Sequence, residues 1–287
     1  MNLTKEQRQN YFNLTGTISA VDIQPGKTQN GVDYIRGTIT VAADDSEFNV
    51  TFFEMKKWKI GTPQERPNPR FVEVQELSNG QAVAFSCSLE ENKFAGNDGS
   101  VISNEQLTLN FINQPRQGDQ PGLTFDMVGV VLAPLKEIKD EKDNTSGYEI
   151  KLGQGQYRAE RGFSVVGLNV NPNMTAAVNY IRDNYKIGDT VRVSGRGKSI
   201  IETTTKTTET LFGEPQVETY QNHTTNYFIE GGLQVSEAMV YSKEEIEALT
   251  TFTKEFEEEL KTKQAAKPKA AATSFEGTGG LSGMLGL

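Results

Sequence analysis

Three residue types that carry much of protein chemistry are almost missing from this chain. Its 287 residues include one cysteine (Cys87), one histidine (His223) and one tryptophan (Trp58). A single cysteine excludes an internal disulfide, which fits a reducing compartment. One cysteine and one distant histidine form neither a zinc ligand set nor an evident nucleophile and base. The sequence therefore predicts a protein that is not an enzyme and uses no metal and no cofactor.

Long hydrophobic runs are missing as well. No apolar stretch approaches the roughly 20 residues that a membrane-spanning helix needs, and the mean hydropathy is −0.52. The first residues, Met1 to Glu6, lack the basic and then apolar pattern of a signal peptide. We therefore expect a cytoplasmic protein with no membrane partner, in the host cytoplasm if a phage encodes it.

Positive charge is scarce relative to negative charge. The chain has 29 Lys and Arg against 38 Asp and Glu, which gives a formal net charge of −9. Protein surfaces that bind nucleic acids are usually basic. Any nucleic-acid site on this protein must therefore be a local basic groove on an acidic body.

The sequence does contain an internal repeat. The segment Phe12–Ile18 (FNLTGTI) is echoed by Phe125–Val131 (FDMVGVV), and Gly80–Ser86 (GQAVAFS) is echoed by Gly188–Ser194 (GDTVRVS). The two pairs are 113 and 108 residues apart. Because the spacing is nearly constant, the chain is expected to hold two copies of one unit of about 110 residues, the size of a small domain.

Alternation of apolar and polar residues predicts five strands in each unit, with a helix between the third and the fourth. The first unit has expected strands over 12–23, 34–41, 47–53, 80–89 and 106–112, and a short helix over 54–59. The second unit has expected strands over 125–132, 148–152, 162–168, 188–194 and 227–229, and a helix over 174–185. This order is typical of the OB-fold, a partly open five-stranded barrel.

We therefore predict a mainly all-β chain of two tandem OB-fold barrels. The first barrel is expected over 1–114 and the second over 124–241, with a linker over 115–123 that is rich in Pro, Gly and Gln. After them, Ser242 and Glu245 form a capping box that predicts an amphipathic helix over 242–263. Its apolar stripe is expected to pack on the second barrel or on a partner.

Residues 264–287 are predicted to be a flexible C-terminal tail, since they are rich in Ala and Gly. Apolar side chains among these residues suggest a short docking motif, with an inert end as the alternative. The candidate docking residues are Phe275, Leu281, Met284, Leu285 and Leu287.

Several segments of the first unit follow one another in a characteristic order. Asn49–Phe53 (NVTFF) precedes the helix and Asn79–Ser86 (NGQAVAFS) follows it, before a Gly-Asn-Asp-Gly turn and a closing strand with Leu107–Phe111 (LTLNF). In this pattern the chain resembles the bacterial-type single-stranded DNA-binding proteins and their phage relatives. The resemblance covers residues 12–113 and, more loosely, 125–235. It implies OB-folds that bind and protect single-stranded DNA, with little sequence preference, in DNA replication, recombination or repair.

The chain departs from that family in two ways. Members usually carry one barrel per chain and end in an acidic run with a terminal Pro-Phe, whereas this chain has two units and ends in GLSGMLGL. A two-barrel replication protein of a phage or plasmid would accommodate both departures. By the same resemblance, the tail is expected to recruit replication or recombination proteins.

Single strands are held by aromatic side chains that stack on bases and by Lys or Arg that follow the phosphates. Candidates in the first unit are Tyr34, Arg36, Phe48, Phe53, Lys56, Lys57, Trp58, Lys59, Lys93 and Phe94. Candidates in the second unit are Tyr148, Tyr157, Arg158, Arg161, Arg192, Arg196 and Lys198, the last three alternating onto one strand face. Two alternatives stay open: RNA binding, which shares the stacking chemistry, and a structural or scaffold protein of a virion whose barrels bind protein.

Overall fold

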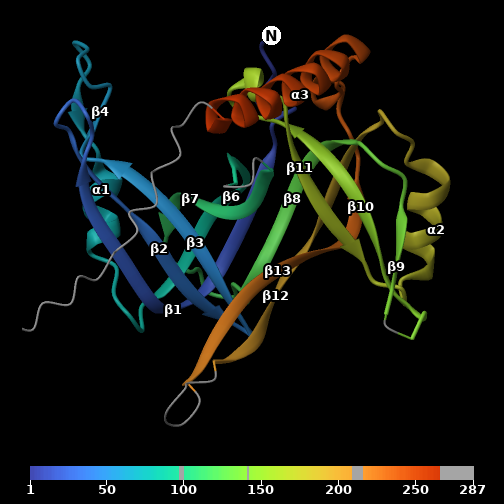
Figure 1. Ribbon diagram of the computed structural model, residues 1–287, viewed down its shortest axis with the longest axis horizontal. Helices are drawn as coiled ribbons and strands as arrows, with labels where there is room; N and C mark the ends of the chain where they lie inside the picture. The colour runs from blue at the N-terminus through green and yellow to red at the C-terminus, as the bar shows by residue number, and fades with distance from the viewer. Residues whose placement is uncertain (97–99, 141, 209–215, 266–287) are drawn as a thin grey trace, which may run out of the picture.

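The computed structural model describes residues 1–96, 100–140, 142–208 and 216–265. It contains two β-barrels side by side, and a long C-terminal helix lies across their junction (Figure 1). We name them barrel 1 and barrel 2 in chain order. The prediction of a mainly β protein with a C-terminal helix is confirmed.

Barrel 1 is a ring of five long strands, each with alternating buried and exposed residues. The strands are β1 (Asn10–Lys27), β2 (Asp33–Ala43), β3 (Ser46–Met55), β6 (Ala82–Ala95) and β7 (Val101–Asn113). β1 pairs with β2 and with β6, β2 pairs with β3, and β6 pairs with β7. β3 and β7 then close the ring as a parallel pair, which gives the strand order of an OB-fold.

The segment between β3 and β6 differs from the sequence prediction. It forms a small hairpin arm, β4 (Lys57–Trp58) and β5 (Arg66–Pro67), and then the helix α1 (Pro69–Gln75). The prediction of a helix over 54–59 is therefore wrong. α1 begins later because Asn68 accepts a hydrogen bond from the Arg70 N–H (3.0 Å) and a proline occupies its first turn, two signals that start helices.

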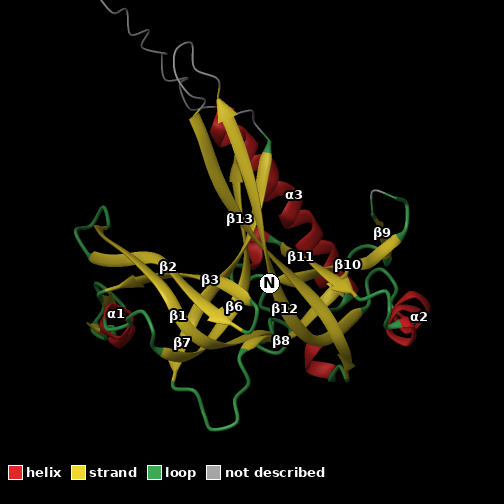
Figure 2. Cartoon of the chain, turned by 90° about the horizontal axis from the view of Figure 1, so that it is seen from below, coloured by secondary structure: helices red, strands yellow, loops and turns green. Residues whose placement is uncertain are grey.

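Barrel 2 repeats the same strand order. Its strands are β8 (Gly122–Val131), β10 (Thr145–Gly155), β11 (Phe163–Val170), β12 (Thr190–Thr208) and β13 (Gln216–Leu233), with a short extra strand β9 (Lys136–Lys139). β8 pairs with β10 and β12, and β11 meets β13 in parallel. The helix α2 (Thr175–Asn184) stands between β11 and β12, where the sequence predicts it. β12 and β13 run far beyond their expected ends as a long hairpin that projects from the barrel (Figure 2).

The two copies of the repeated motif lie against each other. β1 and β8 pair antiparallel with Phe12 opposite Phe125, and the two rings stack with centroids 5.4 Å apart. One continuous sheet therefore runs through both barrels in the order β6, β1, β8, β12. The boundaries at 114, 124 and 241 stay a prediction, since the strands only show where each barrel's elements begin and end.

The second repeated motif is also held in the same way in both barrels. The Gly80 N–H donates to the Ile18 carbonyl (2.8 Å), and the Gly188 N–H donates to the Val131 carbonyl (2.9 Å). These four residues occupy matching positions in the repeat. The repeat found in the sequence is therefore also present in the structure, where both copies form the same backbone hydrogen bond.

Buried apolar side chains form one core through both barrels and a smaller cluster beneath the C-terminal helix. Cys87 belongs to the larger core, and burial raises the pKa of its thiol to about 12. The smaller cluster contains Leu3, Val128, Val130, Phe163, Met239, Tyr241 and Leu249.

The C-terminal helix α3 (Lys243–Ala265) begins at the predicted capping box. The Glu245 N–H donates to the Ser242 hydroxyl (3.2 Å) and the Ser242 N–H donates to the Glu245 carboxylate (2.9 Å). α3 contacts barrel 2 through β11 and the turn η1 (Ala159–Arg161), and it also contacts β6 and β7 of barrel 1. Among the described residues, no helix has the length and apolar character needed to cross a membrane.

Candidate nucleic-acid interface

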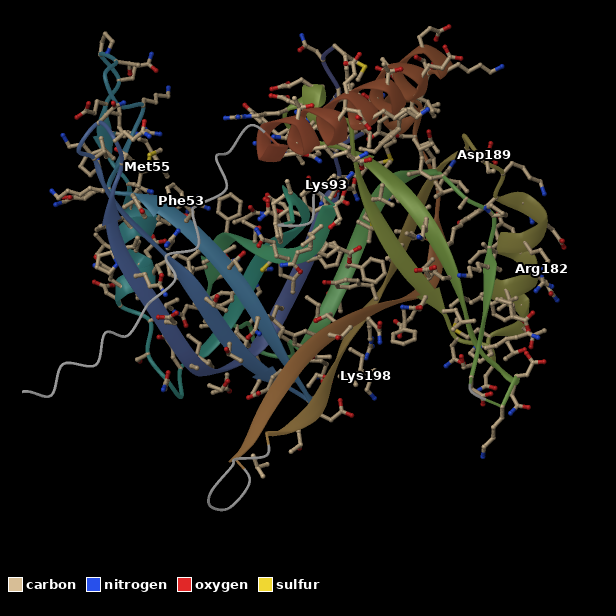
Figure 3. All side chains as sticks on the ribbon, in the orientation of Figure 1. Phe53, Met55, Lys93, Arg182, Asp189 and Lys198 are labelled. Atoms are coloured by element: carbon tan, nitrogen blue, oxygen red, sulfur yellow. The ribbon has the colours of Figure 1, made fainter. Side chains whose placement is uncertain are left out.

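The outer face of β2 and β3 in barrel 1 carries an exposed aromatic ring, Phe53, beside the half-buried Tyr34. Even positions of β2 and odd positions of β3 point away from the core, because Ile35, Ile39 and the even-numbered phenylalanines of β3 are buried inside. Phe53 is 54% exposed, and its ring lies 5.0 Å from that of Tyr34 in a tilted pair (Figure 3). The Tyr34 ring is half-buried and supports Phe53, so the exposed Phe53 ring is the surface on which a base can stack.

A groove of about 550 Å³ crosses this face, and we call it the β2–β3 groove. Arg36, Phe53, Thr38 and Thr51 contribute to its floor, and β1, β6 and β7 provide its sides. Arg36 is exposed and forms no ion pair within the described residues. The Thr108 hydroxyl lies buried beneath the groove and has no hydrogen-bond partner in the described part of the chain. The acidic residues that line it are Asp22 and Glu90.

The small arm beside this groove holds the predicted basic cluster around Trp58. Carboxylates compensate its cations only in part, since Lys56 and Lys57 form ion pairs whereas Lys59 contacts a neutral amide and Arg66 an aromatic ring. The pairs are Lys56–Asp33 (3.3 Å), Lys57–Glu65 (2.6 Å), Lys59–Gln64 and Arg66 over the Trp58 ring (5.1 Å). Exposed ion pairs of this kind are weak, so a ligand could displace them. The pairs themselves give no evidence that the arm binds one.

A second groove, of about 630 Å³, lies where the two barrels meet, and we call it the inter-barrel groove. Four cations line it: Lys5, Arg8, Arg158 and Arg161. None of the four forms an ion pair within the described ranges. Two exposed aromatic side chains accompany them, Tyr11 (48% exposed) and Tyr157 (88% exposed).

The backbone that carries these cations is fixed. The Tyr241 hydroxyl donates to the Gln7 carbonyl (2.6 Å), and the Gln7 side chain donates to the Val240 carbonyl (2.9 Å). Leu3 is buried in the cluster beneath α3. The N-terminal segment is therefore fastened to the chain just before α3, which holds Lys5 and Arg8 at the groove.

The loop on the other side of the groove is held by α3. Gly162 ends the turn η1 at a φ of 75°, and a Cβ there would lie 2.2 Å from the Thr253 hydroxyl. The Thr253 hydroxyl accepts a hydrogen bond from the Phe163 N–H (2.8 Å), and Arg161 lies over the Phe256 ring at 5.7 Å. Only a glycine lets α3 approach this closely, so the loop with Tyr157 and Arg158 has a defined position.

For two residues of barrel 1, the prediction that they contact DNA is wrong. Phe48 is 1% exposed and packs in the core, because it shares the inward face of β3 with Val50. Lys93 is also buried: its Nζ pairs with Glu91 (3.5 Å) and with Glu257 of α3 (2.8 Å). Its position beneath α3 is visible in Figure 3. Neither side chain reaches a ligand, whereas Phe94 near the tip of the same hairpin remains exposed.

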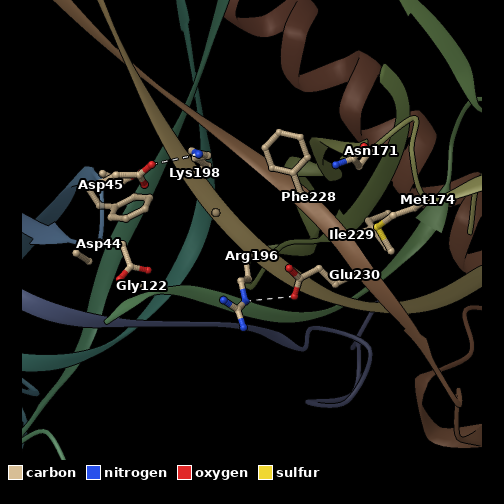
Figure 4. A pocket seen from close by; sticks show the side chains of 14 residues that line it. Asp44, Asp45, Gly122, Asn171, Met174, Arg196, Lys198, Phe228, Ile229 and Glu230 are labelled. Atoms are coloured by element: carbon tan, nitrogen blue, oxygen red, sulfur yellow. Dashed lines mark hydrogen bonds and ion pairs between the residues drawn. The ribbon is translucent and has the colours of Figure 1, made fainter. Parts of the chain in front are cut away.

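The predicted basic row on β12 exists, but carboxylates compensate it. Arg192 makes a two-pronged contact with Asp126 (2.9 and 2.6 Å), which raises the pKa of the arginine. Figure 4 shows the other two pairs, Arg196–Glu230 (3.3 Å) and Lys198–Asp45 (3.3 Å), in a pocket of about 360 Å³. Lys198 lowers the pKa of the Asp45 carboxyl. These cations carry no surplus charge.

The face of barrel 2 that corresponds to the β2–β3 groove is different. The outward residues of β10 and β11 include Lys151 and Asn169 and no aromatic residue. Tyr148, a predicted stacking residue, packs against the core with Arg182 over its ring at 5.5 Å. The start of β11 is covered by barrel 1, since the Val165 N–H donates to Glu91 (2.9 Å).

Sequence reasoning identified Tyr157, Arg158 and Arg161 but missed Lys5, Arg8 and Tyr11. Tyr11 precedes the buried Phe12, so strict alternation in β1 would have placed it on the outer face. Lys5 and Arg8 precede the first strand, and no local pattern indicates that tertiary contacts bring them to the groove.

Structure comparison finds distant neighbours that match 79–80% of the chain. A deletion mutant of the single-stranded DNA-binding protein from Thermus aquaticus shares 13% identity, with 79% of this chain and 95% of that chain covered and a TM-score of 0.49. The wild-type protein of that organism gives 12% identity, coverage of 79% and 93%, and a TM-score of 0.46. A replication protein A heterotrimer bound to single-stranded DNA shares 14% identity, with 80% of this chain and 51% of that chain covered and a TM-score of 0.26.

Sequence comparison gives a family without a stated activity. No curated protein sequence matches the chain. The model of the YorF family matches residues 8–263, which include both barrels and nearly all of α3. The chain therefore belongs to the YorF family.

Proposed function

We propose that this protein binds single-stranded DNA with little sequence preference, in the β2–β3 groove of barrel 1. The observation that carries the proposal is the exposed Phe53, paired with Tyr34 and next to the unpaired Arg36 on an open groove. Aromatic faces accept any base, and a cation beside them meets the phosphates. An exposed aromatic ring in an open groove suits unpaired bases, because a duplex keeps its base faces covered.

The acidic composition is compatible with this function. Stacking contributes about 1–3 kcal/mol per base and does not depend on net charge. Long-range repulsion from the acidic surface would weaken unspecific binding of duplex DNA. We therefore expect a preference for single strands over duplex at equal length.

The test is a titration of labelled oligothymidylate followed by fluorescence anisotropy, with duplex DNA and oligouridylate in parallel. Replacing Phe53 with alanine removes one stacking ring, so Phe53→Ala is expected to bind oligothymidylate about 5- to 150-fold more weakly than the unmodified protein. Tyr180→Ala is the matched control, since Tyr180 is a similarly exposed ring on α2, far from the groove. Equal affinity of the two variants, or no binding at low salt, would overturn the proposal.

We further infer a role wherever single strands are exposed, in replication, recombination or repair, with the tail recruiting a partner protein. The tail residues Phe275, Leu281, Met284, Leu285 and Leu287 lie outside the described residues. Deleting residues 275–287 should leave DNA affinity unchanged and abolish co-purification of the partner. A loss of DNA affinity on this deletion would speak against a docking role.

A further inference from the structure

The β2–β3 groove and the inter-barrel groove each lack part of what holds a single strand: the first has few cations, and the second supplies them. The β2–β3 groove offers the exposed Phe53 ring but, among the described residues, a single cation, Arg36, beside two carboxylates. The inter-barrel groove offers four cations that form no ion pair within the described residues, in a protein of net charge −9, although Arg8 and Arg161 each lie over an aromatic ring. Four cations held together without counterions repel one another, and a bound polyanion would relieve that repulsion.

The two grooves are continuous along one strand of barrel 1. Glu90 on β6 lines both of them, with Asn92 on the side of the β2–β3 groove and Ser88 on the side of the inter-barrel groove. These three residues alternate along β6 and so face the same way. A ligand that leaves one groove along β6 enters the other.

The carboxylates of the inter-barrel groove do not cancel its charge. Glu91 is engaged elsewhere: it pairs with the buried Lys93 and accepts hydrogen bonds from the Ser103 hydroxyl (2.6 Å) and the Val165 N–H (2.9 Å). Glu90 is exposed and accepts a hydrogen bond from the Ser88 hydroxyl (3.3 Å). The groove thus keeps a positive surplus toward a ligand.

The floor of the inter-barrel groove also joins the two barrels rigidly. Asn10 of β1 donates to the Leu89 carbonyl of β6 (2.7 Å) and to the Gln154 side chain of β10 (2.5 Å). Gln154 is buried and donates in turn to the Gln9 carbonyl (2.7 Å). The cations therefore sit on a preformed surface, which lowers the entropy cost of binding.

From this geometry we infer that one DNA strand runs from the β2–β3 groove along β6 into the inter-barrel groove, so that both barrels bind it as one unit. The inference rests on the proposed function and adds the path of the strand. Arg8, which lies over the Tyr157 ring at 5.1 Å, and Arg158 meet the phosphates in the inter-barrel groove, and Tyr11 and the other face of Tyr157 supply further stacking surfaces.

The expected signature is a dependence of affinity on salt and on oligonucleotide length. Each phosphate neutralised on a single strand contributes about −0.7 to the slope of log affinity against log salt. Four cations predict a slope about 2.8 steeper for a long oligonucleotide than for one that fills only the β2–β3 groove. OB-folds cover roughly 4–16 nucleotides each, so oligothymidylates of about 6 and about 30 nucleotides separate the two cases.

The decisive variant is the double substitution Arg8→Ala with Arg158→Ala in the full chain. For the long oligothymidylate we expect the salt slope to fall by about 1.4 and the affinity at 0.1 M salt to fall about 25-fold, taking the electrostatic contribution to vanish near 1 M salt. Binding of the short oligothymidylate should not change. Lys136→Ala with Arg182→Ala is the matched control, since both are exposed cations of barrel 2 that lie outside the groove.

The outcomes separate the inference from the proposed function. If the double variant keeps the slope and affinity of the unmodified protein for the long oligothymidylate, the path is wrong, while an effect of Phe53→Ala on the short one still supports binding by barrel 1. If Phe53→Ala leaves both lengths unaffected, the proposed function fails and the path fails with it. Circular dichroism of each variant checks that the fold is intact, which is expected because the substituted side chains are exposed or, for Arg8, half-buried.

Discussion

Barrel 1 and barrel 2 share a strand order, a helix position and a repeated pair of motifs, yet they expose different outer faces. In barrel 1 the face of β2 and β3 is open and carries Phe53 and Tyr34. In barrel 2 the matching face has no aromatic residue, and the start of its β11 is covered by Glu91 of barrel 1 and by α3. One copy of the repeated fold therefore exposes an open face, whereas the matching face of the other copy is partly covered.

The first test concerns the packing between β1 and β8, where the two barrels meet. Phe12 is fully buried between Phe125 and Tyr227, at 5.4 Å from each ring centroid. Phe12→Ala should lower the free energy of unfolding by about 3–5 kcal/mol, because it leaves a cavity in a core that serves both barrels. Urea denaturation measures this, with Phe53→Ala as the exposed control that should change stability by less than about 0.5 kcal/mol. Similar values for both variants would contradict a shared core.

The second test concerns the contact that covers barrel 2. Lys93 is the buried counterion of Glu91, and it links β6 to α3 through Glu257. Lys93→Met should lower the free energy of unfolding by about 3 kcal/mol at neutral pH, because Glu91 is left buried without a partner charge. The additional change Glu91→Gln should restore part of the loss. Lys254→Met, at an exposed position of α3, is the control; an equal effect there would show that the pair does not hold the barrels together.

The smallest expected effect is a gain of affinity. Glu90 lies where the two grooves join, and its charge opposes a phosphate there. Glu90→Gln should strengthen binding of a long oligothymidylate up to about fivefold at 0.1 M salt, as expected for removing one opposing charge. Glu137→Gln on β9 should change nothing. Weaker binding by Glu90→Gln would place the strand elsewhere.

Much of the fold could be predicted because its signals are local. Alternation along strands and the two repeated motifs give the strand order of both barrels, and the capping box gives the start of α3. The pairing of β1 with β8 could not be predicted, since it depends on how two units meet. The helix expected over 54–59 failed because the caps at Asn68 and Pro69 lie further along the chain.

The residues of the two grooves were predicted less well than the fold, because tertiary contacts decide which side chains are exposed there. Alternation separates the inward Phe48 from the outward Phe53, but only the neighbouring barrel and α3 bury Lys93. The same tertiary contacts bring Lys5 and Arg8 to the inter-barrel groove from a segment without a motif. A basic row such as the one on β12 is visible in sequence, whereas the carboxylates that compensate it come from other strands.

The most direct test of the central claim is photocross-linking of the full chain to oligothymidylate that carries 5-iodouracil, followed by peptide mapping. The account predicts cross-links at Phe53 and Tyr34 of barrel 1, and at Tyr11 and Tyr157 when the oligonucleotide is long enough to reach the inter-barrel groove. It predicts none on the outer face of β10 and β11. Cross-links confined to barrel 2, or to residues outside both grooves, would contradict it.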